Sequence, residues 1–248
     1  MSNQANLSRR FFLSALPAVT AGLAATATAT TAAAAPAGQG SPHWGMLVDT
    51  RRCIACQACT ISCSMENDLP IGQFRTTVAT YAVRSETGQS GLAVLPRLCN
   101  HCEEPPCIPV CPVSATYKRE DGIVLVDGDR CVGCAYCVQA CPYEARFINH
   151  HTGKADKCTF CVHRVDVGLL PACVETCVGG ARIFGDVNDP NSEISRRLKE
   201  AEGQVSVLKP EAGTKPHVFY IGLDKELAGR VDGDSAAEMM WRPEMQGA

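Results

Sequence analysis

The stretch that most constrains how this chain folds is a run of closely and regularly spaced cysteines in residues 131–142. It follows the pattern C-x2-C-x2-C-x3-C-P, and its cysteines are Cys131, Cys134, Cys137 and Cys141. Three thiolates at two-residue intervals hold three corners of a [4Fe–4S] cubane, while the fourth cysteine, beyond that loop, reaches a different cluster. One such run therefore indicates at least two clusters.

The other cysteines form three further groups of four with related spacing. One group repeats the x2-x2-x3 spacing, the next widens it to x2-x4-x3, and the last widens it to x2-x11-x3. In chain order they are Cys53, Cys56, Cys59 and Cys63; Cys99, Cys102, Cys107 and Cys111; and Cys158, Cys161, Cys173 and Cys177. Because the four groups account for all 16 cysteines, none remains for a disulfide or a catalytic thiol. We therefore expect four complete [4Fe–4S] clusters.

Two other uses of cysteine fit this pattern less well. Exported chains rich in cysteine are often held by disulfides, but that device serves small domains, and 248 residues with 46% hydrophobic content can form a core without it. Structural zinc sites join two separated C-x2-C pairs, whereas three cysteines within seven residues crowd a single ion. A broad visible absorption band that bleaches with dithionite would distinguish iron–sulfur clusters from both.

The N-terminal residues have the plan of an export signal. Arg9 and Arg10 are the only charged residues among the first forty, and an uncharged run rich in alanine and threonine follows them to about Ala35. The paired arginines, with two phenylalanines and a leucine behind them, resemble a twin-arginine (Tat) signal. We expect a signal peptide over residues 1–35 and a linker over residues 36–44.

A membrane anchor is the alternative for this segment, because the uncharged run is long enough to span about 30 Å of hydrocarbon. Alanine and threonine make it only mildly apolar, which favours removal. Iron–sulfur clusters are inserted in the cytoplasm, so a protein that carries them outward must cross the membrane folded, as the Tat route permits. The expected location is the periplasmic side of the cytoplasmic membrane, with attachment through a membrane subunit.

The charge balance argues against a nucleic-acid partner. Removing Arg9 and Arg10 from the 23 Lys and Arg leaves 21 against 26 Asp and Glu, a formal net charge of −5, and the sequence contains no basic run. Arg52, Arg130 and Lys157 each directly precede a cysteine of a group. They either neutralise cluster charge or form solvated flanks, and the sequence leaves both readings open.

No pattern in the sequence indicates catalysis. His101 lies among the cysteines and His150-His151 lies in a glycine-containing turn, so the histidines predict no site of their own. A Gly-rich phosphate loop, a nucleophilic triad and a pair of carboxylates at a useful spacing are not recognisable. We expect no enzyme activity from this protein on its own.

Strand-like runs between the cysteine groups predict an α+β fold of the ferredoxin-like kind, in which a unit comprises strand, cluster loop, short helix and strand. A helix is expected after Asn191-Ser192. The expected strands are residues 45–49, 122–127, 181–184 and 214–221.

Four cysteine groups predict two such units, each with two clusters. The second and third groups are about twenty residues apart and predict an inner unit over residues 96–142. The first and fourth groups would close an outer unit around it, over residues 45–95 and 143–200, so that the two units are interleaved. Two surface loop insertions are expected, at residues 70–95 and 162–172. A C-terminal extension that contacts a partner is expected over residues 201–248.

Runs around the cysteines resemble the four-cluster electron-transfer subunits of the molybdopterin oxidoreductases, which include those of the DMSO, polysulfide and tetrathionate reductases. The resemblance covers about residues 45–222. Val178, where many relatives have proline after the last cysteine, favours the tetrathionate reductase branch. The runs that carry the resemblance are residues 96–102, 119–124, 145–150, 155–161, 168–173 and 177–182.

In this family the first and fourth cysteine groups share two clusters, and the second and third groups share the other two. Carried onto this chain, the resemblance implies four ligand sets: Cys53, Cys56 and Cys59 with Cys177; Cys158, Cys161 and Cys173 with Cys63; Cys99, Cys102 and Cys107 with Cys141; and Cys131, Cys134 and Cys137 with Cys111.

The resemblance also implies a role. Four [4Fe–4S] clusters would accept electrons from an integral membrane quinol-oxidising subunit and pass them to a molybdopterin catalytic subunit, most closely that of a tetrathionate reductase in anaerobic respiration. The alternatives are the same relay in a DMSO, polysulfide, sulfite or arsenate enzyme, and a soluble polyferredoxin shuttle. Long inserts and the C-terminal extension favour fixed partners over a shuttle.

Overall fold

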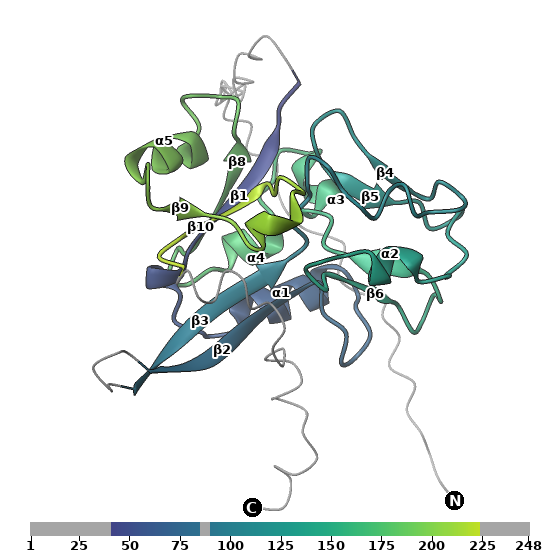
Figure 1. Ribbon diagram of the computed structural model, residues 1–248, viewed down its shortest axis with the longest axis horizontal. Coiled ribbons are helices and arrows are strands. Elements are labelled where there is room, and N and C mark those ends of the chain that lie inside the picture. Colours follow the sequence, from purple (N-terminus) through teal and green to yellow (C-terminus); the bar gives the residue numbers. More distant parts are fainter. Residues whose placement is uncertain (1–40, 85–89, 224–248) are drawn as a thin grey trace, which may run out of the picture. The chain divides into compact units, whose positions relative to one another are not determined.

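The computed structural model describes residues 41–84 and 90–223, which lie within the single unit Gly38–Ala248. Strands and short helices are mixed there (Figure 1), so the fold is of the α+β class, as expected. The strands are β1 (Trp44–Asp49), β2 (Thr76–Arg84), β3 (Ser90–Leu98), β4 (Thr116–Lys118), β5 (Val124–Val126), β6 (Arg146–Ile148), β7 (Ala155–Lys157), β8 (Arg182–Asp186), β9 (Val205–Ser206) and β10 (Val218–Ile221). The helices are η1 (Thr50–Arg52), α1 (Ala58–Glu66), α2 (Tyr136–Gln139), α3 (Val162–Val165), α4 (Ala172–Glu175), α5 (Glu193–Glu200) and η2 (Pro210–Ala212).

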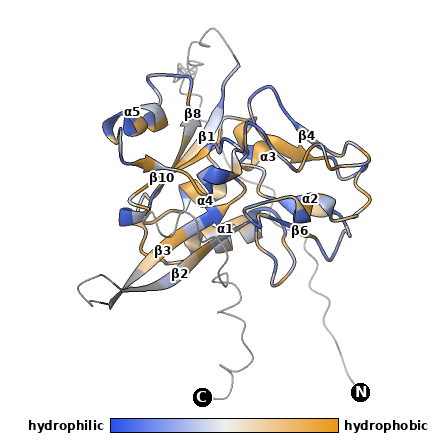
Figure 2. Ribbon diagram, in the orientation of Figure 1, coloured by the Kyte–Doolittle hydropathy of each residue, from blue (hydrophilic) through white to orange (hydrophobic). Residues whose placement is uncertain are grey.

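β1 is a central strand of a four-stranded sheet whose order is β8-β1-β10-β9. It pairs antiparallel with β8 and parallel with β10, so that Met46 lies opposite both Phe184 and Val218. Every residue of β1 after Trp44 is buried. A strand with neighbours on both sides and cover on both faces is hydrophobic throughout, and the same character is visible along β10 in Figure 2.

The two faces of this sheet belong to different cores. Leu47 and Ile221 pack with Ile194 of α5 in one hydrophobic cluster. Met46 and Tyr220 belong to the other cluster, which contains cysteine side chains. Because successive side chains of a strand point to opposite faces, a single sheet separates α5 from the cysteine-containing core.

The expected helix after Asn191-Ser192 is confirmed as α5. Ser192 is its N-cap, and the Ser192 Oγ accepts a hydrogen bond from the Ser195 N–H at 3.2 Å. This bond satisfies one of the free N–H groups of the first turn. The expected strands are confirmed, with bounds that differ by at most four residues, as β1, β5, β8 and β10.

Residues 70–95 are not the surface loop that the sequence predicted. β2 and β3 form a long antiparallel hairpin in which Ala79 lies opposite Leu95, and both side chains are buried. Residues 76–81 are rich in threonine, with a valine and a tyrosine, a composition typical of a strand. The prediction was wrong: a long segment between two cysteine groups suggests an insertion, but this composition favours paired strands that pack into the core.

Residues 201–248 are also not wholly an extension. β10 lies between β1 and β9, so the chain up to Ile221 is part of the central sheet. The insert at residues 162–172 does contain a surface loop, since residues 166–170 are exposed after α3. The expected signal peptide at residues 1–35 and the tail from residue 224 lie outside the described residues.

Within residues 41–84 and 90–223, no helix is both long and apolar enough to cross a membrane.

Candidate iron–sulfur sites

The sixteen cysteines lie around four cavities, with four cysteines lining each. Site I is lined by Cys53, Cys56, Cys59 and Cys177; site II by Cys63, Cys158, Cys161 and Cys173; site III by Cys99, Cys102, Cys107 and Cys141; and site IV by Cys111, Cys131, Cys134 and Cys137. These groupings are the four sets that the resemblance implied, and each combines three cysteines of one sequence group with one of another.

Burial makes several of these thiols poor places for an uncompensated negative charge. It raises the pKa of Cys63 and Cys102 to about 12 and that of Cys173 to about 11. Four thiolates around one cavity therefore need cations among them, and the iron ions of a [4Fe–4S] cluster would supply that charge. All sixteen are free thiols in the structure, so the donor set and the burial fit one cluster in each cavity.

Left-handed backbone turns bring the cysteines of a loop together. Gln57 and Ala135 each stand two positions before the third cysteine of their group, with φ of 61° and 64°, and they precede α1 and α2. Few residues other than glycine adopt a positive φ, and those that do concentrate at functional sites. The turn lets α1 and α2 begin directly before Cys59 and Cys137, so that these sulfurs face the same cavity as the earlier cysteines of the loop.

The fourth cysteine of a group accepts a hydrogen bond from the residue four positions further on. Such bonds join Ala115 N to Cys111 Sγ at 3.2 Å, Ala181 N to Cys177 Sγ at 3.2 Å, and the Asn67 amide to Cys63 Sγ at 3.6 Å. The two backbone bonds form because the residue before each donor, Ser114 or Gly180, has a positive φ. Hydrogen bonds to the sulfurs of a cluster are one of the features that set its reduction potential.

Three buried cations stand between successive sites. Arg182 interacts with Cys59 of site I and Cys173 of site II, and its Nη1 lies 3.8 Å from Cys173 Sγ. Lys157 interacts with cysteines of sites II and III, namely Cys158 and Cys99.

Arg146 occupies the corresponding position between sites III and IV. Its Nη2 lies 3.0 Å from Cys107 Sγ, and it also interacts with Cys137. The cations thus connect the four sites in the order I, II, III, IV.

The pKa values of these cations reflect both their burial and the sulfurs around them. Burial lowers the pKa of Arg182 and of Arg146, but the neighbouring thiolates raise it more, so that both stay above the ordinary value for arginine. For Lys157 burial is the larger effect and the pKa lies below its ordinary value. Each group is almost completely enclosed, so its charge acts on the nearby sites with little screening by water.

The sequence anticipated only one of these cations. Lys157 is buried, whereas Arg130 is exposed and forms a solvated flank. Arg52 is also exposed, but it lines site I. Arg146 and Arg182 each stand five positions after the fourth cysteine of a group, where β6 and β8 begin. The two arginines share this offset, but the other two groups have Asp68 and Thr116 there, so the offset by itself does not identify a buried cation.

His101 lines none of the four cysteine sites. Its ring is fully buried and stacks on Phe160 with the ring centroids 3.7 Å apart. The Val124 N–H donates to its Nδ1 at 3.1 Å, and burial holds its pKa well below the ordinary value. A neutral imidazole packed in this way is part of the core.

The sequence predicted no site among the histidines, but the structure brings two of them together with a glutamate. His43, Glu103 and His217 converge so that one nitrogen or oxygen of each lies within 4.8 Å of the others. His43 and His217 are 174 positions apart, so no local spacing in the sequence indicates this cluster.

Comparison with known proteins agrees with the cysteine sites. Residues 91–187 match the family model of a 4Fe-4S dicluster domain. The chain is 61% identical to the tetrathionate reductase B subunit of Salmonella typhimurium, over 95% of this chain and 96% of that protein. It is 42% identical to the tetrathionate reductase B subunit of Archaeoglobus fulgidus, over 75% of this chain and 89% of that protein.

A third relative belongs to a different reductase. The polysulfide reductase B subunit of Wolinella succinogenes is 42% identical over 72% of this chain and 93% of that protein. Likeness over most of the length of these subunits, together with cysteine cavities suited to clusters, identifies the type of protein. The chain belongs to the family of the tetrathionate reductase B subunits and their relatives, the [4Fe–4S] electron-transfer subunits of reductase complexes.

Proposed function

We propose that this chain is the electron relay of a tetrathionate reductase, with one [4Fe–4S] cluster at each of sites I to IV and electrons passing along that row. The observation that carries the proposal is the grouping of the sixteen cysteines around four cavities that buried cations connect in sequence. A row of closely spaced clusters suits electron transfer over a distance that one cluster cannot cover.

The shared cysteines support an interleaved architecture. Sites I and II would draw their ligands from the first and fourth cysteine groups, and sites III and IV from the second and third. An outer dicluster unit, residues 45–95 and 143–200, would then enclose an inner unit, residues 96–142. The central sheet joins both ends of the outer unit, since β8 pairs with β1.

The proposed partners are a molybdopterin catalytic subunit and an integral membrane subunit that oxidises quinol. A chain that stores and transfers electrons needs one partner that supplies them and one that consumes them. The 61% identity to a tetrathionate reductase subunit favours tetrathionate as the substrate of the catalytic partner. The Tat signal proposed for residues 1–35 would place the chain on the periplasmic side of the cytoplasmic membrane.

Membranes that contain this chain and its partners should couple quinol oxidation to tetrathionate reduction. Reduced quinol analogue is supplied anaerobically, and the consumption of tetrathionate is measured. Membranes from a strain that lacks only this chain are the control, and they should retain tetrathionate reduction from an artificial dye that donates directly to the catalytic subunit. Reduction of polysulfide, DMSO or arsenate with no action on tetrathionate would contradict the substrate while leaving the relay intact.

The two ends of the row carry exposed apolar side chains, which supports docking of one partner at each end. Among the sixteen cysteines only Cys56 of site I and Cys134 of site IV are exposed. Ile54 lines site I and is 64% exposed, and Val132 lines site IV and is 63% exposed. Apolar side chains around an exposed cluster allow a partner to approach closely and to exclude water.

Replacing Ile54 by glutamate should weaken the binding of one partner by at least about tenfold, because an unpaired carboxylate would be buried at the interface. Replacing Val132 by glutamate should weaken the binding of the other partner by a similar factor. Binding is measured with each purified partner, and iron content confirms that the clusters remain. Ile71→Glu is the matched control, because Ile71 is 85% exposed but lines none of the cysteine sites. Loss of the same partner in both variants would contradict docking at opposite ends.

A further inference from the structure

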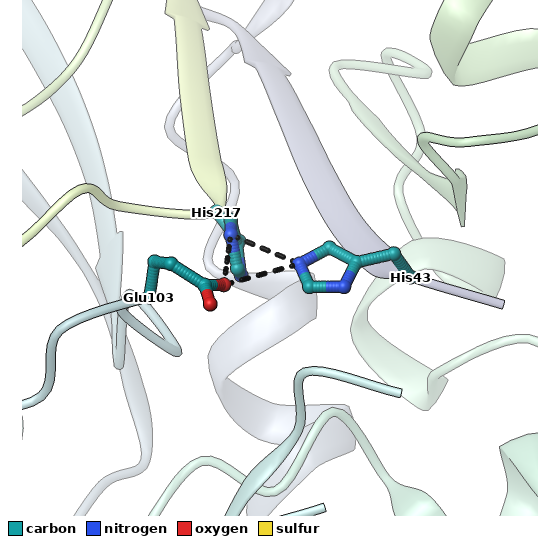
Figure 3. A group of neighbouring side chains, drawn as sticks. All are labelled: His43, Glu103 and His217. Atoms are coloured by element: carbon teal, nitrogen blue, oxygen red, sulfur yellow. Dashed lines mark hydrogen bonds and ion pairs between the residues drawn. The ribbon is translucent and has the colours of Figure 1, made fainter. Parts of the chain in front are cut away.

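We propose that His43, Glu103 and His217 bind a divalent transition-metal ion of the zinc type, at a site separate from the four cysteine sites. The three side chains come from distant parts of the chain and point toward one another (Figure 3). His43 precedes β1, His217 precedes β10, and Glu103 follows Cys102 of site III.

The spacing of the ligand atoms suits a metal ion. The two Nε2 atoms are 3.0 Å apart, and Glu103 Oε2 lies 3.5 Å from His43 Nε2 and 3.3 Å from His217 Nε2. Zinc bonds of about 2.0–2.1 Å in tetrahedral geometry separate neighbouring ligand atoms by roughly 3.3–3.4 Å. The three atoms therefore already outline a face of such a tetrahedron.

The donor types point to the same class of ion. Two imidazole nitrogens and one carboxylate oxygen with a fourth, open position form a known zinc donor set. The side chain of Glu103 is 45% exposed and that of His217 is 12% exposed, so an ion can enter from solvent and take a water molecule as fourth ligand. None of the three residues lines a cysteine site.

Hydrogen bonds hold the backbone of each of the three ligand residues in place, so these segments need little rearrangement when an ion binds. The hydrogen bonds are His43 N to Asp186 Oδ1 at 2.8 Å, Glu103 N to Lys215 O at 2.8 Å, His217 N to Asn100 O at 2.9 Å, and Met46 N to His217 O at 2.9 Å. The ends of β1 and β10 and the loop after site III are thereby already held side by side.

Two neighbours position the side chains. Lys118 Nζ lies 2.6 Å from Glu103 Oε1, which orients the carboxylate and leaves Oε2 to face the histidines. Gly122 makes room for the imidazole of His43, since a methyl group there would lie 2.8 Å from its Cε1 atom. A bound ion would join three segments that also carry the walls of site III and the central sheet.

The test measures zinc binding to the cluster-loaded protein. The wild-type chain is dialysed anaerobically against buffered zinc, and zinc and iron are counted in the same sample. About one zinc per sixteen irons is expected. His43→Gln and His217→Gln should each weaken zinc binding by at least about tenfold, with iron content unchanged. His163→Gln is the matched control, because His163 also pairs with a glutamate, Glu66, at 2.8 Å but belongs to no group of three ligands in the described chain.

X-ray absorption at the zinc edge supplies a second readout that does not depend on the variants. We expect nitrogen and oxygen neighbours at about 2.0–2.1 Å and no sulfur neighbour at about 2.3 Å. A sulfur shell would place the zinc at cysteines and overturn the site. Equal zinc binding by the wild type and by both variants would also overturn it, and would leave the three residues as a hydrogen-bonded cluster only.

Discussion

Replacing Cys111 by serine is expected to alter the cluster at site IV and to leave site III unchanged. Cys111 belongs by sequence to the group that otherwise lines site III, but it lines the cavity of Cys131, Cys134 and Cys137. Serine supplies at best an oxygen ligand, so the expected product is a three-iron cluster, or a cluster of shifted potential, at one site. Iron should fall from about sixteen to about fifteen per chain in the first case.

The result is read by EPR spectroscopy of the reduced and oxidised protein, with two reference variants. Cys131→Ser removes a ligand of site IV and should alter the same signal as Cys111→Ser. Cys99→Ser removes a ligand of site III and should alter a different signal. If Cys111→Ser instead matches Cys99→Ser, each sequence group binds its own cubane, and the interleaved architecture is wrong.

Replacing Arg182 by methionine is expected to lower the reduction potentials of the clusters at sites I and II. Its buried guanidinium lines site I and also contacts Cys173 of site II, where its positive charge favours the more negative, reduced form of each cluster. At a separation of roughly 10 Å and an effective dielectric constant of about 20, one charge changes the free energy of reduction by about 1.7 kcal/mol, or roughly 70 mV for one electron. Methionine retains much of the volume and removes the charge.

The same substitution should reduce stability. Arg182 Nη2 donates to Thr76 Oγ1 at 2.8 Å and Nη1 lies 3.8 Å from Cys173 Sγ. Removing one partner of a buried charged pair typically costs about 3–5 kcal/mol, so unfolding in denaturant should occur at a lower concentration. Arg196→Met is the control, because Arg196 is exposed on α5 and its loss should change neither property.

The Arg146→Met variant tests whether each buried cation affects the reduction potentials of only its two neighbouring sites. Arg146→Met should lower the potentials at sites III and IV and leave sites I and II unchanged, because Arg146 interacts with cysteines of the former pair. Redox titration followed by EPR resolves the four clusters. A shift of the same size at all four sites in either variant would indicate a general structural change, and would contradict the placement of one cation between each neighbouring pair.

Local features of this protein were predictable because they depend on chain geometry over a few residues. The spacing of cysteines such as Cys131, Cys134 and Cys137 fixes how many thiolates a short loop presents to one cofactor, and this identified the cluster type and number. β1 and the start of α5 at Ser192 were also predictable, since a hydrophobic run and an N-cap act through neighbours in the sequence.

Two other features leave a signal in the sequence, but in each case another reading of the same residues competes with it. The β2–β3 hairpin has strand composition, but it also separates two cysteine groups, a position that equally suggests a loop insertion. Arg146 and Arg182 share an offset from the fourth cysteine of a group, but nothing local distinguishes a buried arginine from the exposed Arg130 or Arg52. Whether such a side chain is buried depends on which other parts of the fold pack around it. Here each arginine begins a β-strand and lies next to two cysteine sites.

The sequence by itself determined the cofactor, through the number and spacing of its cysteines, and the family, through the runs around them. Only the tertiary structure decided where β10 lies, which buried cations separate the sites, and that His43, Glu103 and His217 meet. The physical reason is that these contacts join residues separated by up to 174 positions. They arise from strand register and packing, which no spacing along the chain encodes.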